Sequence, residues 1–123
     1  MSSIICLTCM SLKNFRFGVC CLFVVTSTSD TISQNSTYIQ NPGFPSVYSE
    51  TSSLTYTIHK CSSDVCAVRL DFETFTTRGP TSTEEASGGV CSDSFVVSGT
   101  SGYSTPVICG SNAGQHSKFY CIS

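Results

Sequence analysis

Cysteine content constrains this chain more than any other feature, because nine of its 123 residues are cysteine. A chain this short and this rich in cysteine usually folds in an oxidising compartment, where disulfides supplement a small hydrophobic core. Its length allows one domain and leaves no room for a second catalytic lobe. The sequence therefore predicts a single-domain module that is secreted and extracellular.

The charge balance limits the kinds of partner. Charged residues make up 11% of the chain, six basic against eight acidic, for a formal net charge of −2. No basic footprint is present that could hold a phosphate backbone, so nucleic acid is not an expected partner. Aromatic residues, at 11% of the chain, can still support a small core, which argues against disorder.

The first 29 residues read differently from the rest. Residues 1–28 contain no acidic side chain, and Lys13 and Arg16 precede an apolar run at 17–25 that small polar residues follow. This order of features is typical of a secretory signal peptide. The apolar run is too short for a spanning helix, so no stable membrane span is expected. We predict a hydrophobic leader over 1–29, either a signal peptide or the remnant of a cysteine-rich segment.

From Asp30 onward, short alternating runs are broken by turn residues, which is the pattern of an all-β sandwich. Every second side chain is apolar within residues 54–60 and 66–75, so each segment is expected to be a strand with one face in the core. The expected inward side chains are Leu54, Tyr56, Ile58, Val68, Leu70 and Phe72. Further strands are expected at 37–40, 90–98 and 106–110, and no helix of credible length is expected.

Four cysteines pair sensibly by their positions between these strands. Cys61 and Cys66 bracket a polar turn, so a bridge would close a tight connection. Cys91 and Cys109 flank two later strand candidates, and closing that interval would contribute about 3 kcal/mol. If the leader is removed, Cys121 is left alone, which in a secreted chain indicates a free thiol, an intermolecular bridge or a missing partner. A homodimer linked through Cys121 therefore stays open.

Five ordered blocks of the sequence resemble those of a CUB domain. The blocks cover residues 38–48, 54–58, 68–75, 91–97 and 108–110. The run from Phe17 to Cys21 and the surroundings of the later cysteines are most similar to secreted arthropod CUB proteins. The resemblance implies a jelly-roll antiparallel β-sandwich over 30–116, in which Cys91 and Cys109 form the family's last disulfide.

The chain also departs from the family. The family's first disulfide cannot form, because other residues stand where relatives place cysteines: Thr28, Ser36 and Leu54. The resemblance ends near His116, which leaves 117–123 as an unmatched tail and implies that the last strands of the sandwich are missing. A CUB-like domain over 30–116 is therefore expected to be truncated.

Cofactors and metals are not expected. The resemblance would place calcium-binding carboxylates where this chain has Arg78 and Ser94, with Asp93 one position early. The pair Cys6 and Cys9 has C-x-x-C spacing but neither the βαβ context of a redox site nor a second pair for zinc.

Two residue types remain as candidate sites. Asn35 begins an Asn-Ser-Thr sequon, so it is expected to be glycosylated and exposed just before a strand. The only histidines, His59 and His116, lie in no catalytic motif, so the chain is not expected to be an enzyme.

The expected function is that of a non-catalytic extracellular module that binds a protein or a glycan through its loops and strand edges. The candidate loops are residues 76–89 and 99–105. Two alternatives stay open: a self-associating structural component linked by disulfides, and a non-functional fragment of a longer, protease-associated CUB protein.

Overall fold

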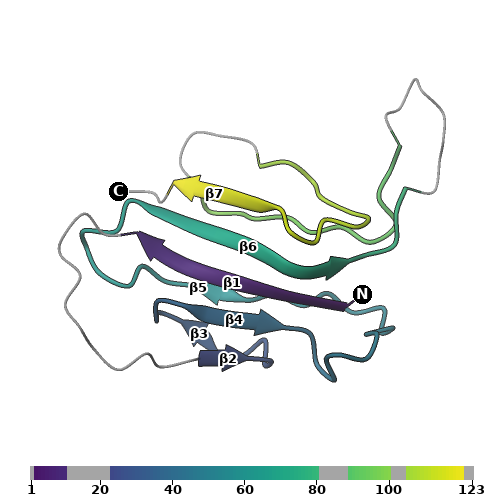
Figure 1. Ribbon diagram of the computed structural model, residues 1–123, viewed down its shortest axis with the longest axis horizontal. Helices are drawn as coiled ribbons and strands as arrows, with labels where there is room; N and C mark the ends of the chain where they lie inside the picture. The colour runs from purple at the N-terminus through teal and green to yellow at the C-terminus, as the bar shows by residue number, and fades with distance from the viewer. Residues whose placement is uncertain (1, 11–22, 81–88, 101–104, 121–123) are drawn as a thin grey trace.

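Seven strands form two sheets in the computed structural model, which describes residues 2–10, 23–80, 89–100 and 105–120 (Figure 1). The main sheet has the order β2-β4-β1-β6-β7, and the small sheet pairs β3 with β5. The strands are β1 Ser2–Met10, β2 Phe23–Val25, β3 Thr31–Ile32, β4 Thr37–Gln40, β5 Thr57–Ile58, β6 Ala67–Thr76 and β7 His116–Tyr120. No helix occurs within the described residues, in agreement with the all-β prediction.

Strand directions are mixed. β1 pairs antiparallel with β4 and β6, and β6 pairs antiparallel with β7. β2, however, pairs parallel with β4, and β3 pairs parallel with β5. The prediction of an antiparallel sandwich is therefore wrong for these two pairs. Each parallel pair joins very short strands, of two to four residues, connected by chain that leaves the sheet before returning.

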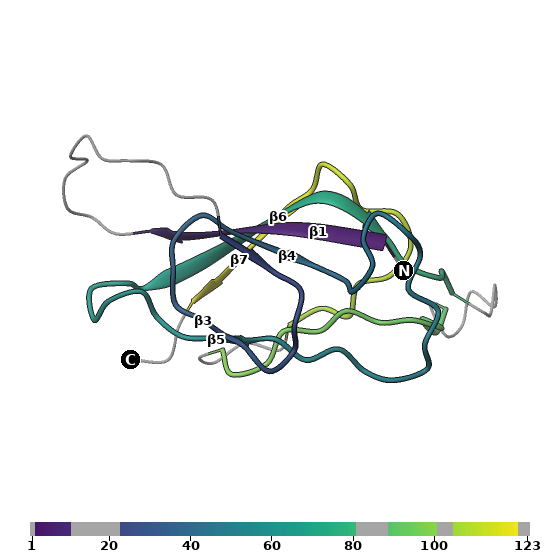
Figure 2. The same ribbon diagram turned by 90° about the horizontal axis from the view of Figure 1, so that it is seen from below.

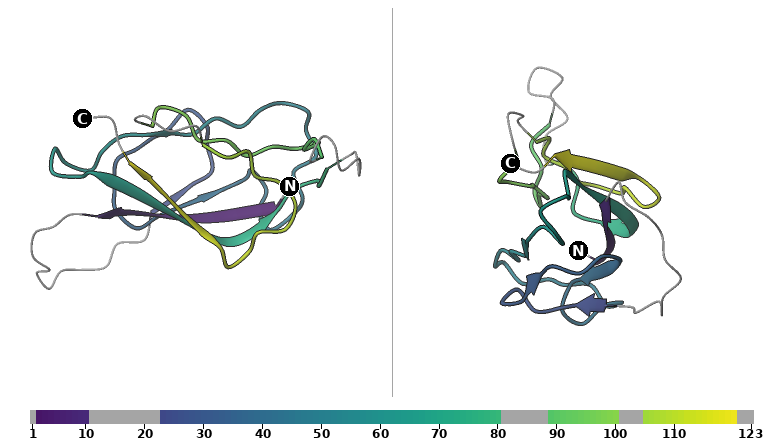
Figure 3. Two further views of the ribbon diagram at one scale, coloured as in Figure 1. Left: turned by 90° about the horizontal axis from the view of Figure 1, so that it is seen from above. Right: turned by 90° about the vertical axis from the view of Figure 1, so that its left-hand side faces the viewer.

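A second layer lies against one face of the main sheet (Figures 2 and 3). It contains the small sheet and the extended segments 89–100 and 105–110. These segments meet at one antiparallel bridge, where Phe95 N donates to Ile108 O at 2.8 Å and Ile108 N donates to Phe95 O at 3.0 Å. The continuous strands expected at 90–98 and 106–110 do not form, and Pro106 has no N–H with which to extend the ladder.

The core lies between these layers. Its buried members, among the residues whose burial is described, are Ile32, Ile39, Val65, Val68, Leu70, Phe72 and Phe75. The predicted inner face of β6 is confirmed, since Val68, Leu70 and Phe72 are all buried. The alternation expected at 54–60 appears in the burial, since Leu54, Tyr56 and Ile58 are half-buried and Thr55, Thr57 and His59 are exposed. The strand expected over this whole range is limited to Thr57–Ile58.

An irregularity in β6 puts two aromatic rings on the same side of the sheet. Phe72 and Phe75 are three residues apart, which in a regular strand would place them on opposite faces. The β1–β6 register shifts so that Ile4 pairs with Thr74 and Ile5 with Phe72, and Glu73 is skipped. Because this bulge adds one residue to β6, both rings enter the core, where Phe75 is fully buried.

The sheet extends beyond both boundaries drawn from the sequence. β1, which lies within the expected leader, is central in the main sheet, and all nine of its residues pair with β6. Four residues of the expected tail, 117–120, belong to β7. The sequence predicts no strand in either segment, because a strand at these positions depends on its pairing with β6.

β4 ends where the sequence predicts, at the turn of residues 41–46, which contains two prolines. Asn41 is buried, and its side-chain amide donates to Pro42 O at 3.0 Å and to Ser46 O at 3.3 Å. Gly43 has a φ of 77°, which favours glycine. The buried amide therefore holds this turn against the end of the sheet.

Candidate functional site

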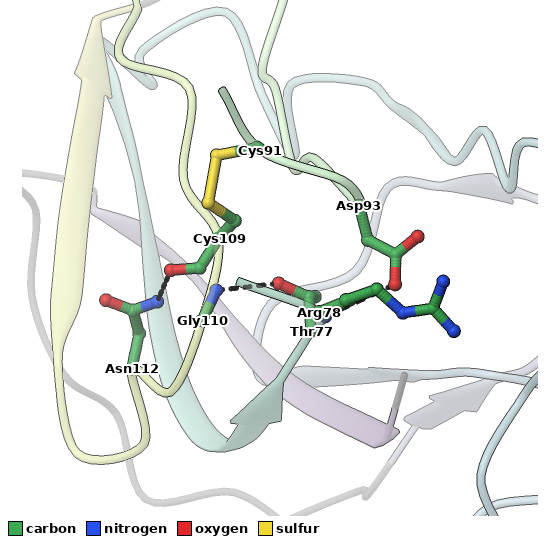
Figure 4. The surroundings of a disulfide bond; sticks show 7 residues. All are labelled: Thr77, Arg78, Cys91, Asp93, Cys109, Gly110 and Asn112. Atoms are coloured by element: carbon green, nitrogen blue, oxygen red, sulfur yellow. Dashed lines mark hydrogen bonds between the residues drawn. A yellow bond between two sulfur atoms is a disulfide. The ribbon is translucent and has the colours of Figure 1, made fainter. Parts of the chain in front are cut away.

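A disulfide joins the two extended segments of the second layer near the end of β6 (Figure 4). Cys91 and Cys109, the pair that both spacing and resemblance suggested, have an S–S distance of 2.03 Å and a Cα–Cα distance of 5.9 Å. Beside them, Thr77 N donates to Gly110 O at 3.0 Å, and Gly110 N donates to Thr77 Oγ1 at 2.9 Å. Asn112 Nδ2 donates to Cys109 O at 2.9 Å. The loop after Cys109 is thus held to the segment 89–100 by the disulfide and to Thr77, just after β6, by hydrogen bonds.

This end of the molecule is where the resemblance would place calcium ligands. Asp93 Oδ2 instead accepts a hydrogen bond of 3.2 Å from the backbone N–H of Arg78 (Figure 4). Within the described ranges, no three His, Cys, Asp or Glu side chains gather closely enough to hold a metal ion. The Asp93 carboxylate therefore acts as a tie between two loops.

The cysteine pairing expected in the turn after β5 requires correction. Cys66 is an exposed free thiol, whereas Cys61 is disulfide-bonded to a cysteine other than Cys66. Val65 between them is buried, and its N–H donates to Ser62 O at 3.2 Å. Because Val65 faces the core, the next side chain along the extended backbone, Cys66, faces outward, while Cys61 packs against the core. The two cysteine side chains thus lie on different sides of this connection.

The predicted glycosylation residue, Asn35, is exposed in the turn before β4. Its Oδ1 accepts a hydrogen bond of 2.9 Å from Ser36 N, and Ser36 has a φ of 57°. Thr37, the third residue of the sequon, is buried, and its hydroxyl donates to Gln34 O at 2.9 Å. A glycan on Asn35 would project from this turn into solvent.

The two histidines lie on different elements. His59 follows β5, and His116 begins β7, where it is opposite Asp71. Both are exposed. The structure therefore does not bring the histidines into one site.

Several expected features lie largely outside the described residues. Residues 81–88 of the candidate loop 76–89 and residues 101–104 of the candidate loop 99–105 lie outside them. Cys121, the candidate for a disulfide-linked homodimer, also lies outside them.

A groove that sequence reasoning missed opens between the two layers. It has a volume of about 510 Å³, within the range of ligand pockets. The sheet contributes Ile39, Val68, Leu70 and Phe119, and the second layer contributes Leu54, Tyr56, Ile58, Phe95 and Val97, among others. The alternating residues of 54–58 were predicted as core, but their half-buried state shows that one side faces this groove. The groove was not predictable from the sequence, because it depends on the distance between the two layers and a sequence pattern does not specify that distance.

Tyr56 anchors one wall of the groove. Its hydroxyl donates to Gln40 O at 3.0 Å, which links the second layer to the end of β4. Burial raises the pKa of Tyr56 above its ordinary value of 10.0, and Coulombic repulsion from Tyr48 adds to the rise. Tyr56 is therefore a neutral hydrogen-bond donor at neutral pH.

The other exposed feature is the edge of the main sheet. β7 ends the strand order of the described sheet, and Phe72 N donates to Gln115 O at 2.9 Å just before it. Because hydrogen-bonded pairs alternate along an antiparallel ladder, Ser117 and Phe119 direct their backbone groups toward β6. His116, Lys118 and Tyr120 then direct theirs away from it. All three have exposed side chains as well.

Comparisons with protein families, with curated proteins and with solved structures gave no match to this chain. Across the parts of the chain that the structure describes, no helix is long and apolar enough to cross a membrane.

Proposed function

We propose that this chain is a non-catalytic, extracellular CUB-like module with a jelly-roll ancestry that binds another protein by strand addition at β7. The Cys91–Cys109 disulfide supports an oxidising compartment, and the five sequence blocks support the CUB relationship. The observation that carries the binding mode is the outward backbone of His116, Lys118 and Tyr120 at the sheet edge. A glycan is the alternative ligand, and it would use the same exposed side chains.

Strand addition needs an edge with free main-chain groups and side chains that discriminate between partners. β7 has five residues, and three of them present a donor and an acceptor outward. Its central residue, Lys118, is a positive charge on the outer face of the sheet, opposite Arg69 in the register. An incoming antiparallel strand with a carboxylate opposite Lys118 would gain about 0.2–1 kcal/mol over an uncharged one.

Lys118 also disfavours the pairing of β7 with β7 of a second copy of this chain. Antiparallel pairing of two β7 strands that uses all five residues places Lys118 directly opposite Lys118. Like charges in directly opposed positions are destabilising, and a lysine in an edge strand is a common protection against such pairing. We therefore favour a different partner protein over the self-associating alternative.

The test is a titration of isotope-labelled protein with strand-forming peptides that differ only in a central Glu, Gln or Lys. The Glu peptide should shift the amide resonances of β7 most strongly and the Lys peptide least. Lys118→Glu should reverse that order, and the matched control Arg78→Glu, on an exposed residue beyond the end of β6 and outside β7, should keep it. Equal shifts from all three peptides, or shifts confined to other strands, would refute edge recognition.

A further inference from the structure

The groove between the layers has a lining of unusual charge. Of the described residues that line it, only His59 and Lys60 carry ionisable basic groups, and none is Asp or Glu. The chain as a whole has more acidic than basic residues. The groove is therefore a mainly apolar space with one lysine in its lining, in a protein of net negative charge.

Lys60, the lysine of this lining, comes shortly before β6 in the chain. Lys60 is followed by the turn of residues 61–66, which leads directly into Ala67 at the start of β6. Ala67 pairs with Tyr120 at the end of β7, and both Lys60 and Tyr120 line the groove. Most of the remaining lining residues are apolar, and Thr55, Ser98 and Thr100 are polar members. Lys60 thus adds a positive charge to a mainly apolar lining.

We propose that this groove binds a single-chain fatty carboxylate, with its acyl chain between the layers and its carboxylate beside Lys60. The apolar walls replace water around the acyl chain, and the exposed ammonium of Lys60 complements the anionic head. This inference goes beyond the protein-binding role of β7. Tyr120 belongs to both surfaces, but Lys60, which would hold the carboxylate, lies outside β7, and Lys118, which would select the peptide, does not line the groove. The two can thus fail independently.

Two properties of the ligand should govern affinity. Burial of each added methylene should tighten the dissociation constant about fourfold until the chain fills the groove. The head group should matter less, because an exposed ion pair changes affinity by about two- to fivefold. A fatty carboxylate should therefore bind somewhat more tightly than the alcohol of the same chain length.

The experiment is calorimetric titration of the whole chain, below micelle-forming concentrations, with octanoate, decanoate, dodecanoate and dodecanol. We expect affinity to rise along the carboxylate series and dodecanoate to exceed dodecanol. Lys60→Gln should weaken dodecanoate about two- to fivefold and leave dodecanol unchanged. The matched control Lys118→Gln should change neither.

A second pair of variants tests the location without touching the buried core. Val96 lines the groove and is 53% exposed, whereas Val107 is 58% exposed and does not line it. Val96→Asp should weaken dodecanoate about tenfold or more, since it places a carboxylate in the apolar space, and Val107→Asp should have little effect.

Affinity that does not depend on chain length, or equal effects of the two valine variants, would overturn the proposal. The proposal would also be overturned if the chain formed a dimer and dodecanoate neither bound to that dimer nor dissociated it. A second copy of the chain would then occupy the groove. Failure of the β7 peptides to bind, with dodecanoate binding intact, would instead refute only the proposed function.

Discussion

The aromatic cluster at the bulge of β6 offers the sharpest test of the core. Phe75 is fully buried, with its ring centroid 4.9 Å from that of Phe72 and 5.6 Å from that of Phe95. The Phe75–Phe95 pair is edge-to-face, with an interplanar angle of 85°. Such pairs contribute about 0.5–1.5 kcal/mol beyond their buried area. The rings join β6 of the main sheet to the second layer.

The perturbation is a double-mutant cycle with Phe75→Leu and Phe95→Leu. Leucine retains most of the apolar volume, so each variant should fold and should lose about 1–2 kcal/mol of unfolding free energy. The coupling energy between the two should be about 0.5–1.5 kcal/mol. Urea denaturation followed by far-ultraviolet circular dichroism gives all four unfolding free energies.

The control is Phe23→Leu combined with Phe75→Leu. Phe23 is 40% exposed on β2, and the order β2-β4-β1-β6 separates it from β6 by about 14 Å at ordinary strand spacing. These two substitutions should be additive to within about 0.5 kcal/mol. If Phe75 and Phe95 were equally additive, the bulge would not bring them together, and our assignment of the β6 register would be wrong.

Four further predictions follow from individual contacts. Replacing both Cys91 and Cys109 with Ser should lower the unfolding free energy by about 3 kcal/mol in denaturant titrations. Iodoacetamide should modify Cys66 in the native protein, as read by peptide mass spectrometry, and leave Cys91 unmodified. Asn41→Ala should cost about 1–3 kcal/mol, because it removes the donors to two turn carbonyls. Folding raises the pKa of Tyr56 above its ordinary value of 10.0. The protonated hydroxyl therefore stabilises the folded state fully below pH 10.0, and this contribution is lost as the pH rises through the folded-state pKa. Tyr56→Phe should accordingly be less stable than wild type at neutral pH, and the difference should shrink above pH 10.0 in alkaline denaturation curves.

Predictions from the sequence were correct where the alternation of apolar residues and the positions of turn residues indicate the same strand. β4 ends at the expected asparagine and prolines, and the inward residues of β6 follow the period of two. The bulge was not predictable from that period, since Phe72 and Phe75 satisfy it only when Glu73 is skipped. Register of this kind depends on the partner strand, which local sequence does not specify.

Long-range partners were the main source of error. Cys61 and Cys66 are close in sequence, yet buried Val65 directs them to different sides, so proximity gave the wrong pair. The groove and the edge at β7 also depend on tertiary arrangement, because the expected tail becomes a strand only through its pairing with β6. Lys118 belongs to no sequence motif. It is a candidate binding residue only because it lies on the last strand of the described sheet.

The most direct test of the account is amide hydrogen exchange resolved for each residue by nuclear magnetic resonance in the native protein. Both the sheet order and the free edge predict its pattern. The amides of β1, paired on two sides, should exchange as slowly as those of β6. In β7, Ser117 and Phe119 should be protected, whereas His116, Lys118 and Tyr120 should exchange rapidly. Unprotected amides throughout Ser2–Met10, or uniform protection of β7, would contradict a five-stranded sheet with an open binding edge.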